Sequence, residues 1–394
     1  MVTEILPGVH WVGVVDWALR HFHGFEISTH RGSTYNSYLI MDEKIALVDT
    51  VWDPFDAQFI ENIRQVVDPA KIDYVIANHA EPDHSGSLPL LMSLCPKAKL
   101  VVSKRGLESI PGHYHQNWDF LPVKTGDRIS LGKRELIFIE ATMLHWPDSM
   151  FTYLTGGNLL MSNDAFGQHY ASDYRFNDQV NQTELMEEAI KYYANILTPY
   201  SDQALKKIDE LLALNLPVDV IAPSHGVIWR KAPLQIVAKY QEWAKQENPR
   251  RAVVLFDTMY HATRKMAEAV GEGLAEAGVP FKLFHMAVSD RNDMITEIFQ
   301  SRAVVLGCPT INRGVMPTMA SMLEDLRGLR FKNKVAGVFG SYGWGGEAVK
   351  AIEEGIAKAG YPLAGPSVSV KWQPRPEDLE NCRKLGRAVA AAMK

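Results

Sequence analysis

Seven histidine and carboxylate side chains between positions 79 and 225 have the types and spacing of a metal site. Four of them fall in the six-residue segment HAEPDH, and three stand alone further along the chain. The set is His79, Glu81, Asp83, His84, His145, Asp164 and His225. Four imidazoles and three carboxylates without a thiolate suit two first-row metal ions sharing one bridging carboxylate, and an oxygen-rich set favours iron or manganese over zinc. We therefore expect a two-metal site, and the ligand types alone leave open whether it serves redox or hydrolytic chemistry.

The expected secondary structure explains how these residues meet. Each ligand-type group comes directly after a β-rich run, and loops at strand ends are where α/β scaffolds hold reactive groups. The four runs are DYVIAN, ELIFIEAT, NLLMSN and DVIAPS, at residues 73–78, 135–142, 158–163 and 219–224. Taken singly, each histidine or aspartate would be an ordinary hydrogen-bonding residue. Their repetition after four strands argues against that interpretation and predicts a mixed α/β domain rich in sheet.

The pattern changes after a polar stretch that contains Pro249. From there, short apolar runs alternate with amphipathic helical stretches, which predicts a parallel sheet with helices on both faces. We place the domain boundary at this stretch and expect one domain over residues 1–248 and a second over residues 249–394. No internal repeat is visible.

Three loops of the second domain could form a binding site, because each follows a predicted strand. Hydroxyls and N–H groups at a helix start can bind phosphate, and the later loops could flank an aromatic ring. Neither GxGxxG nor GxxxxGK[ST] occurs here, so a dinucleotide or nucleotidase site is not indicated. The candidates are Thr258, Met259, Tyr260, His261, Ala262 and Thr263, then Pro309, Thr310 and Asn312, then Ser341, Tyr342, Gly343, Trp344 and Gly345.

Composition excludes several classes of protein. Of the 394 residues, 46% are apolar and 22% charged, which is ordinary for a globular protein and argues against disorder. A net charge of −5 offers no basic field for nucleic acid. With no long apolar run and no signal-like start, we expect a cytoplasmic protein without a membrane partner. The three scattered cysteines, Cys95, Cys308 and Cys382, fit neither a disulfide framework nor a thiolate metal site.

The segment HAEPDHSG resembles the HxHxDH motif of metallo-β-lactamase-like proteins, with Glu81 in place of the second histidine. The resemblance implies an αββα sandwich. A carboxylate in place of a neutral imidazole adds negative charge, which favours Fe(III) over a hydrolytic dizinc site. The second domain resembles flavodoxin, a doubly wound parallel sheet, and this implies FMN as its cofactor.

Together the two domains resemble the flavodiiron proteins, also called A-type flavoproteins, over essentially the whole chain. The resemblance implies that His79, Glu81 and His145 bind one iron, that Asp83, His84 and His225 bind the other, and that Asp164 bridges them. In some members the imidazole corresponding to His84 is turned away and water replaces it. Tyr193 is a candidate hydrogen-bond donor to an iron-bound ligand, or else a core residue. His23, Phe25 and Tyr35 lie in a segment that could reach the pocket.

The resemblance also implies an activity: reduction of O2 to water, of NO to N2O, or of both, with electrons relayed through FMN. In that family a head-to-tail homodimer brings one subunit's FMN to the other's iron pair, and we expect a dimer or a tetramer. The chain ends soon after its last predicted helix, so an external donor is expected, rubredoxin or a reduced deazaflavin. Two alternatives remain: a dimetal hydrolase with a regulatory flavodoxin-like domain, and a non-catalytic electron-transfer or sensor protein.

Overall fold

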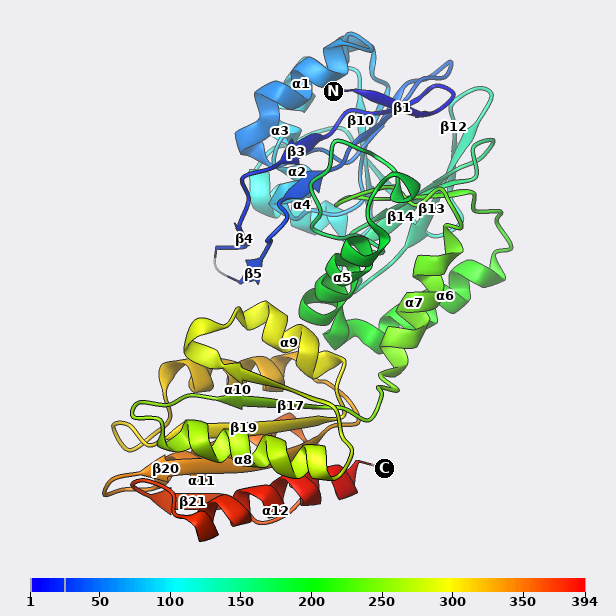
Figure 1. Ribbon diagram of the computed structural model, residues 1–394. Helices are drawn as coiled ribbons and strands as arrows, with labels where there is room; N and C mark the ends of the chain where they lie inside the picture. The colour runs from blue at the N-terminus through cyan, green and yellow to red at the C-terminus, as the bar shows by residue number, and fades with distance from the viewer. Residues whose placement is uncertain (1, 25, 394) are drawn as a thin grey trace. The chain divides into compact units, whose positions relative to one another are not determined.

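The computed structural model describes residues 2–24 and 26–393, which form two compact units (Figure 1). The first comprises the chain up to Tyr193 together with Tyr200–Ala244, and the second comprises Ala194–Pro199 and the chain from Lys245 onward. The division thus falls four residues before the predicted boundary, at the end of a helix. The short segment 194–199 groups with the second unit through spatial contacts, which a linear pattern of residues cannot reveal.

Two facing β-sheets form the centre of the first unit. The seven-stranded sheet has the order β1 (Thr3–Leu6), β2 (Val9–Trp11), β7 (Tyr38–Ile40), β8 (Ala46–Val48), β9 (Tyr74–Ala77), β10 (Lys99–Ser103) and β11 (Phe120–Val123). The five-stranded sheet has the order β12 (Arg128–Ser130), β13 (Glu135–Glu140), β14 (Met150–Leu154), β15 (Leu159–Asn163) and β16 (Val220–Pro223). Alternate residues of facing strands, such as Ile76, Val101 and Phe138, pack into one apolar core between the sheets.

Helices cover the outer faces of both sheets (Figure 1). Those on the side of the seven-stranded sheet are α1 (Asp56–Arg64), α3 (Leu88–Leu94) and α4 (Gly106–Tyr114). Helices α6 (Ser201–Ala213) and α7 (Leu234–Lys245) lie on the five-stranded sheet, where Ile139 and Leu160 face them. The predicted αββα sandwich is confirmed. The remaining elements are the one-turn α2 (Pro82–Ser85), α5 (Gln182–Tyr192), and the ribbons β3 (Val14–Asp16) with β6 (Ser33–Tyr35) and β4 (His21–Phe22) with β5 (Ile27–Ser28).

Strand directions bring the candidate ligands to one edge of the sandwich. Strands β15 and β16 run parallel, and β13 runs in the same direction because β14 is antiparallel to both β13 and β15. The ligand-bearing loops follow the carboxyl ends of β9, β13, β15 and β16. This arrangement is the one expected from the strand-end positions of the ligands in the sequence.

The second unit is a five-stranded, fully parallel sheet with the order β18 (Phe281–His285), β17 (Ala252–Phe256), β19 (Ala303–Pro309), β20 (Val335–Tyr342) and β21 (Val368–Lys371). Helices α8 (Ala262–Glu276) and α12 (Pro376–Ala392) pack together on one face. Helices α9 (Arg291–Phe299), α10 (Pro317–Leu329) and α11 (Glu347–Ala359) cover the other (Figure 1). The doubly wound sheet is confirmed, with strand β21 as an addition that its short sequence VSVK did not predict.

Two negative expectations concern the described part of the chain. Among residues 2–24 and 26–393, no helix has the length and apolar character needed to cross a membrane. Cys95, Cys308 and Cys382 are buried free thiols, and none lies in the candidate metal groups. Among the described residues, the candidate metal groups consist of imidazole and carboxylate side chains.

Candidate metal centre and cofactor pocket

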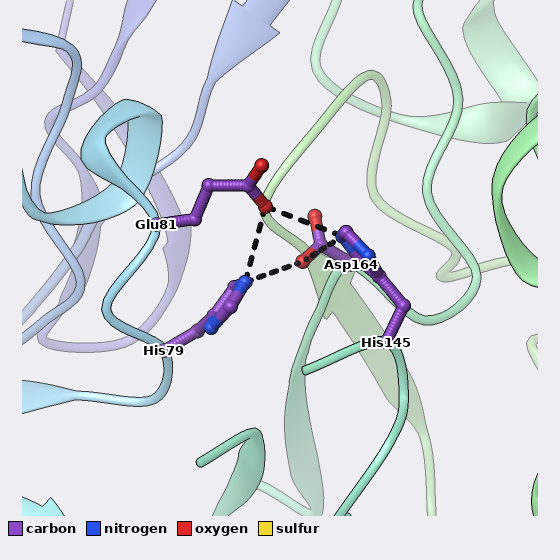
Figure 2. Close-up of side chains that lie close together, drawn as sticks. All are labelled: His79, Glu81, His145 and Asp164. Carbon is purple, nitrogen blue, oxygen red and sulfur yellow. Dashed lines mark hydrogen bonds and ion pairs between the residues drawn. The ribbon is translucent and has the colours of Figure 1, made fainter. Parts of the chain in front are cut away.

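The first group of ligand atoms comes from His79, Glu81, His145 and Asp164 (Figure 2). The Oε2 atom of Glu81 lies 3.1 Å from Nε2 of His79 and 3.3 Å from Nε2 of His145. The Oδ2 atom of Asp164 lies 3.8 Å and 3.6 Å from the same two nitrogens. Four donor atoms from three strand-end loops thus surround one point, as the ligands of a single metal ion do.

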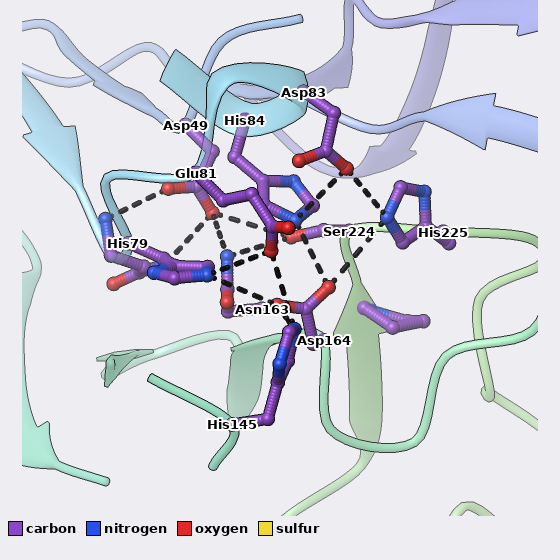
Figure 3. A network of polar contacts seen from close by, with 12 residues as sticks. Asp49, His79, Glu81, Asp83, His84, His145, Asn163, Asp164, Ser224 and His225 are labelled. Carbon is purple, nitrogen blue, oxygen red and sulfur yellow. Dashed lines mark hydrogen bonds and ion pairs between the residues drawn. The ribbon is translucent and has the colours of Figure 1, made fainter. Parts of the chain in front are cut away.

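The second group lies beside the first and contains Asp83, His84 and His225 (Figure 3). Oδ2 of Asp83 is 3.0 Å from Nε2 of His225 and 3.3 Å from Nε2 of His84. Oδ1 of Asp164 is 2.9 Å from Nε2 of His84 and 3.6 Å from Nε2 of His225. Asp164 therefore offers one oxygen to each group, the geometry of a bridging carboxylate. His84 faces the cluster through Nε2.

The buried atoms of the cluster fit a pair of cations. Both carboxylate oxygens of Asp83 and Oδ2 of Asp164 are buried without a hydrogen-bond partner. Burial alone would raise the pKa of Asp164, but the nearby His84, with His145 and His79, outweighs it and lowers that pKa far below its ordinary value. Buried charged oxygens without partners are costly unless a counter-charge satisfies them. Nitrogen and oxygen donors in two groups joined by one carboxylate suit two iron ions.

Hydrogen bonds behind the ligands fix their ring orientation. Nδ1 of His225 lies 2.7 Å from the carbonyl oxygen of Thr34, which can only accept, so Nδ1 carries the proton and Nε2 is free to bind a metal. Nδ1 of His79 lies 3.2 Å from Asp148 Oδ1, and the backbone N–H of Ala80 donates to the other oxygen of Asp148. Such carboxylate–histidine pairs raise the basicity of a metal-binding imidazole.

A buried carboxylate, Asp49, ties together the strand ends that carry the ligands (Figure 3). It accepts hydrogen bonds from the backbone and side-chain amide of Asn78 at 2.8 and 3.1 Å, and from Asn163 and Ser224 at 3.5 Å. These three residues directly precede His79, Asp164 and His225. One side chain therefore sets the spacing of three loops, a role that its isolated position in the sequence did not reveal.

Of the two alternatives for Tyr193, the structure agrees with the core residue, and the catalytic role is corrected. The hydroxyl of Tyr193 pairs with Ser201 at 3.0 Å, and its ring packs on Tyr240 and Trp243. Its neighbour Tyr192 is the tyrosine that reaches the cluster, donating to Oδ1 of Asp164 at 2.9 Å. Consecutive helical residues point about 100° apart, so only one of the pair can face the site.

Residues of the N-terminal segment also approach the cluster. Nε2 of His23 lies 2.8 Å from Oε1 of Glu81, and the ring of Tyr35 lies 6.0 Å from that of His225. Phe25 falls outside the described residues. His169 is a buried neighbour that the sequence did not single out: its Nδ1 is 2.8 Å from Ser33 Oγ, and its ring is 5.0 Å from that of His225.

The second unit contains a cavity of about 970 Å³ at the carboxyl ends of its strands. This volume is in the upper range of cofactor sites. Twelve of the fourteen predicted residues line it: Thr258, Met259, Tyr260, Ala262, Pro309, Thr310, Asn312, Ser341, Tyr342, Gly343, Trp344 and Gly345. The buried Oγ1 of Thr258 has no hydrogen-bond partner, as expected of a hydroxyl that receives a phosphate oxygen.

The other two predicted residues do not line this cavity. Thr263 is buried, with Oγ1 2.8 Å from Oγ of Ser341, and His261 directly precedes helix α8 in the left-handed conformation. In their place the cavity gains Trp372 and Gln373, which follow the unpredicted strand β21, and Arg313. The cavity fits a flavin mononucleotide, with a candidate phosphate cradle at the Thr258 loop and aromatic side chains at Tyr342, Trp344 and Trp372.

Fold and site together define a lactamase-like dimetal domain joined to a flavodoxin domain. Comparisons with known proteins agree: a family model described as ODP family beta lactamase matches residues 34–226, and a flavodoxin model matches residues 254–386. The chain is 52% identical to a nitric oxide reductase of Moorella thermoacetica, covering 99% of this chain and 98% of that protein.

Two solved structures extend the likeness. Rubredoxin:oxygen oxidoreductase from Desulfovibrio gigas is 39% identical, with a TM-score of 0.97 over 100% of this chain and 98% of that one. The flavodiiron protein from Giardia intestinalis is 34% identical, with a TM-score of 0.93 over 99% and 96%. The chain belongs to the flavodiiron proteins, oxidoreductases that carry FMN and a non-haem di-iron site. The alternative interpretation as a hydrolase is not supported.

Proposed function

We propose that this flavodiiron protein is a nitric oxide reductase, which converts two NO, two electrons and two protons into N2O and water. The observation that carries the proposal is the position of Asp164, which offers one oxygen to each of two adjacent ligand groups. A paired site of this kind can hold two NO molecules side by side. The Moorella relative, at 52% identity, is named a nitric oxide reductase, and this supports NO over O2.

The seven candidate ligands divide between two iron ions. One iron would be held by His79, Glu81 and His145, the other by Asp83, His84 and His225, with Asp164 between them. When reduced, the iron pair and FMN would each supply two electrons. Reduction of two NO to N2O needs only two electrons. The protein contributes ligand orientation and a buried site with fixed charges.

Side chains around the ligands would prepare the site for the gas. The Tyr192 hydroxyl donates to Oδ1 of Asp164, with 2.9 Å between the two oxygens, and so holds a proton beside the shared carboxylate. His23 holds Oε1 of Glu81, which leaves Oε2 facing His79 and His145. The rings of Phe22 and Tyr35, which pack on His225, shield that part of the cluster from water.

The direct test compares NO and O2 as substrates of the iron-loaded, FMN-loaded protein with reduced rubredoxin as donor. We expect kcat/KM for NO to exceed that for O2 by about a hundredfold, which corresponds to roughly 2.7 kcal/mol of transition-state stabilisation. N2O should appear at one molecule per two NO consumed. The similarity to the Desulfovibrio oxygen oxidoreductase makes O2 reduction the second candidate, and a preference of the same size for O2 would establish it instead.

We further propose that the working unit is a head-to-tail homodimer, or a tetramer built from it, fed by rubredoxin. Trp344 and Trp372, which line the cofactor pocket, are 95% and 67% exposed, and large exposed aromatic groups suit a protein partner. Analytical ultracentrifugation of the holoprotein at micromolar concentration should show a dimer or a multiple of it. Full turnover by a monomer would refute the proposal, and turnover with a reduced deazaflavin alone would replace rubredoxin as donor.

A further inference from the structure

An apolar cavity in the first unit is lined by helices α6 and α7 and by the outer face of the five-stranded sheet. Its volume is about 100 Å³. The floor includes Ile139 and Ile221 from the sheet, and Ile208 of α6 and Val237 of α7 close it from above. The hydroxyl of Tyr153, at the wall, already donates to the carbonyl of Pro217 at 2.7 Å. A water molecule in such a space would find few polar partners.

The cavity extends from the protein surface toward the interior. At its outer end lie Leu212 and Leu234, each 51% exposed. At its inner end lies Phe166, which is 1% exposed and comes two residues after the bridging ligand Asp164. One apolar passage therefore begins at solvent and ends beside the loop that carries the central ligand.

A second, smaller cavity shares Phe166, Ile208 and Leu211 with the first. Its volume is only about 10 Å³, and its lining includes Leu144 and Ala165. These two residues are the immediate chain neighbours of the ligands His145 and Asp164. Only the three shared side chains are common to both linings, and the smaller space lies against the residues next to two candidate ligands.

We propose that these cavities bind small apolar gases and form an entry route for NO to the metal centre. The proposal rests on the function proposed above and adds the route by which the substrate arrives. NO and O2 are small, uncharged and weakly hydrated, so they enter dry apolar space readily, whereas ions and redox donors do not. An unfilled cavity costs stability, so a space of this size is not favoured by packing alone.

The volume and the apolar lining of the cavity suit a small, uncharged gas molecule. A dry protein cavity of roughly 150 Å³ is known to bind xenon or benzene. The present space is smaller, too small for a peptide segment or a flavin, and the described residues around it provide no charged group except Lys207 at the smaller cavity. A diatomic gas fits both its volume and its polarity.

Xenon is the probe for this site. Crystals of the holoprotein under xenon pressure should show xenon between Ile139, Phe166 and Ile208. The side chain introduced by Ile208→Trp should fill the cavity, so crystals of this variant should lack xenon at that position. Leu214→Trp is the matched control, because Leu214 follows the same helix, is 43% exposed and does not line the cavity. If Ile208→Trp does not fold, Ile208→Phe provides a milder filling.

The functional readout is NO binding measured without turnover. In anaerobic stopped-flow experiments with the reduced protein, the bimolecular rate of NO binding should fall about tenfold in Ile208→Trp and stay unchanged in Leu214→Trp. Iron and FMN contents should be unchanged in both. Xenon absent from the cavity, an alkyl chain occupying it, or an unchanged NO binding rate in the filled variant would each overturn the proposal. Failure of the proposed function would appear separately, as absence of N2O during turnover.

Discussion

Replacement of Asp164 by alanine is expected to remove both metal ions and to lower gas turnover by at least about a hundredfold. Asp164 is the only residue among the candidate ligands whose two oxygens are divided between the two groups. Loss of a side chain that merely supports a ligand costs roughly 10- to 100-fold in metal affinity, so loss of a shared ligand should cost at least that much. Iron per chain after dialysis and anaerobic NO consumption measure the two effects.

Asp83→Ala provides the matched control for this variant. Asp83 is also a buried carboxylate, but its contacts are with His84 and His225, the second group only. We expect this variant to retain one iron per chain and Asp164→Ala to retain none. FMN content should be unaffected in both, because the cofactor pocket is formed entirely by residues of the second unit. Equal iron loss in the two variants would contradict the bridging role of Asp164.

Four of the candidate ligands could be predicted from the sequence because each of them follows a recognisable strand. His79, His145, Asp164 and His225 each follow a β-rich run, and in a sandwich of this kind the carboxyl ends of the strands meet at one edge. The doubly wound sheet could be predicted for a similar reason, since alternating strands and helices allow few other topologies. Both predictions rest on the order of strands and helices along the chain, which can be recognised from short stretches of sequence.

The parts that could not be predicted depend on register or on long-range contacts. Tyr192 and Tyr193 are adjacent tyrosines, and only the rotation of helix α5 decides which one faces Asp164. Trp372 and Gln373 follow a strand of only four residues, VSVK, whose alternation is too short to stand out, so the fourth loop of the cofactor pocket was missed. Asp49 supports three loops through contacts with residues 29, 114 and 175 positions away, and no local motif marks it.

A second large effect is expected at Glu81, where the chain departs from the HxHxDH motif. Glu81→His replaces a carboxylate by a neutral imidazole and lowers the negative charge of the seven ligand side chains from three to two. One unit charge about 4 Å away, at an effective dielectric constant of about 20, contributes about 4 kcal/mol, or roughly 180 mV for one electron. We therefore expect the midpoint potential of the iron pair to rise by on the order of 100 mV, and the zinc-to-iron ratio of the purified protein to increase.

Glu81→Gln separates charge from ligand type, because glutamine keeps the shape of glutamate but is neutral and adds no imidazole. Both variants should raise the midpoint potential, measured by redox titration followed by EPR, whereas only Glu81→His should bind more zinc. His23→Ala is a further control, since it removes the 2.8 Å partner of Oε1 and leaves Oε2 between His79 and His145. If Glu81→His keeps the iron content and the midpoint potential of the unmodified protein, the carboxylate is not what adapts this lactamase-like site to iron. The other six ligands and their hydrogen-bond partners must then account for the choice of metal.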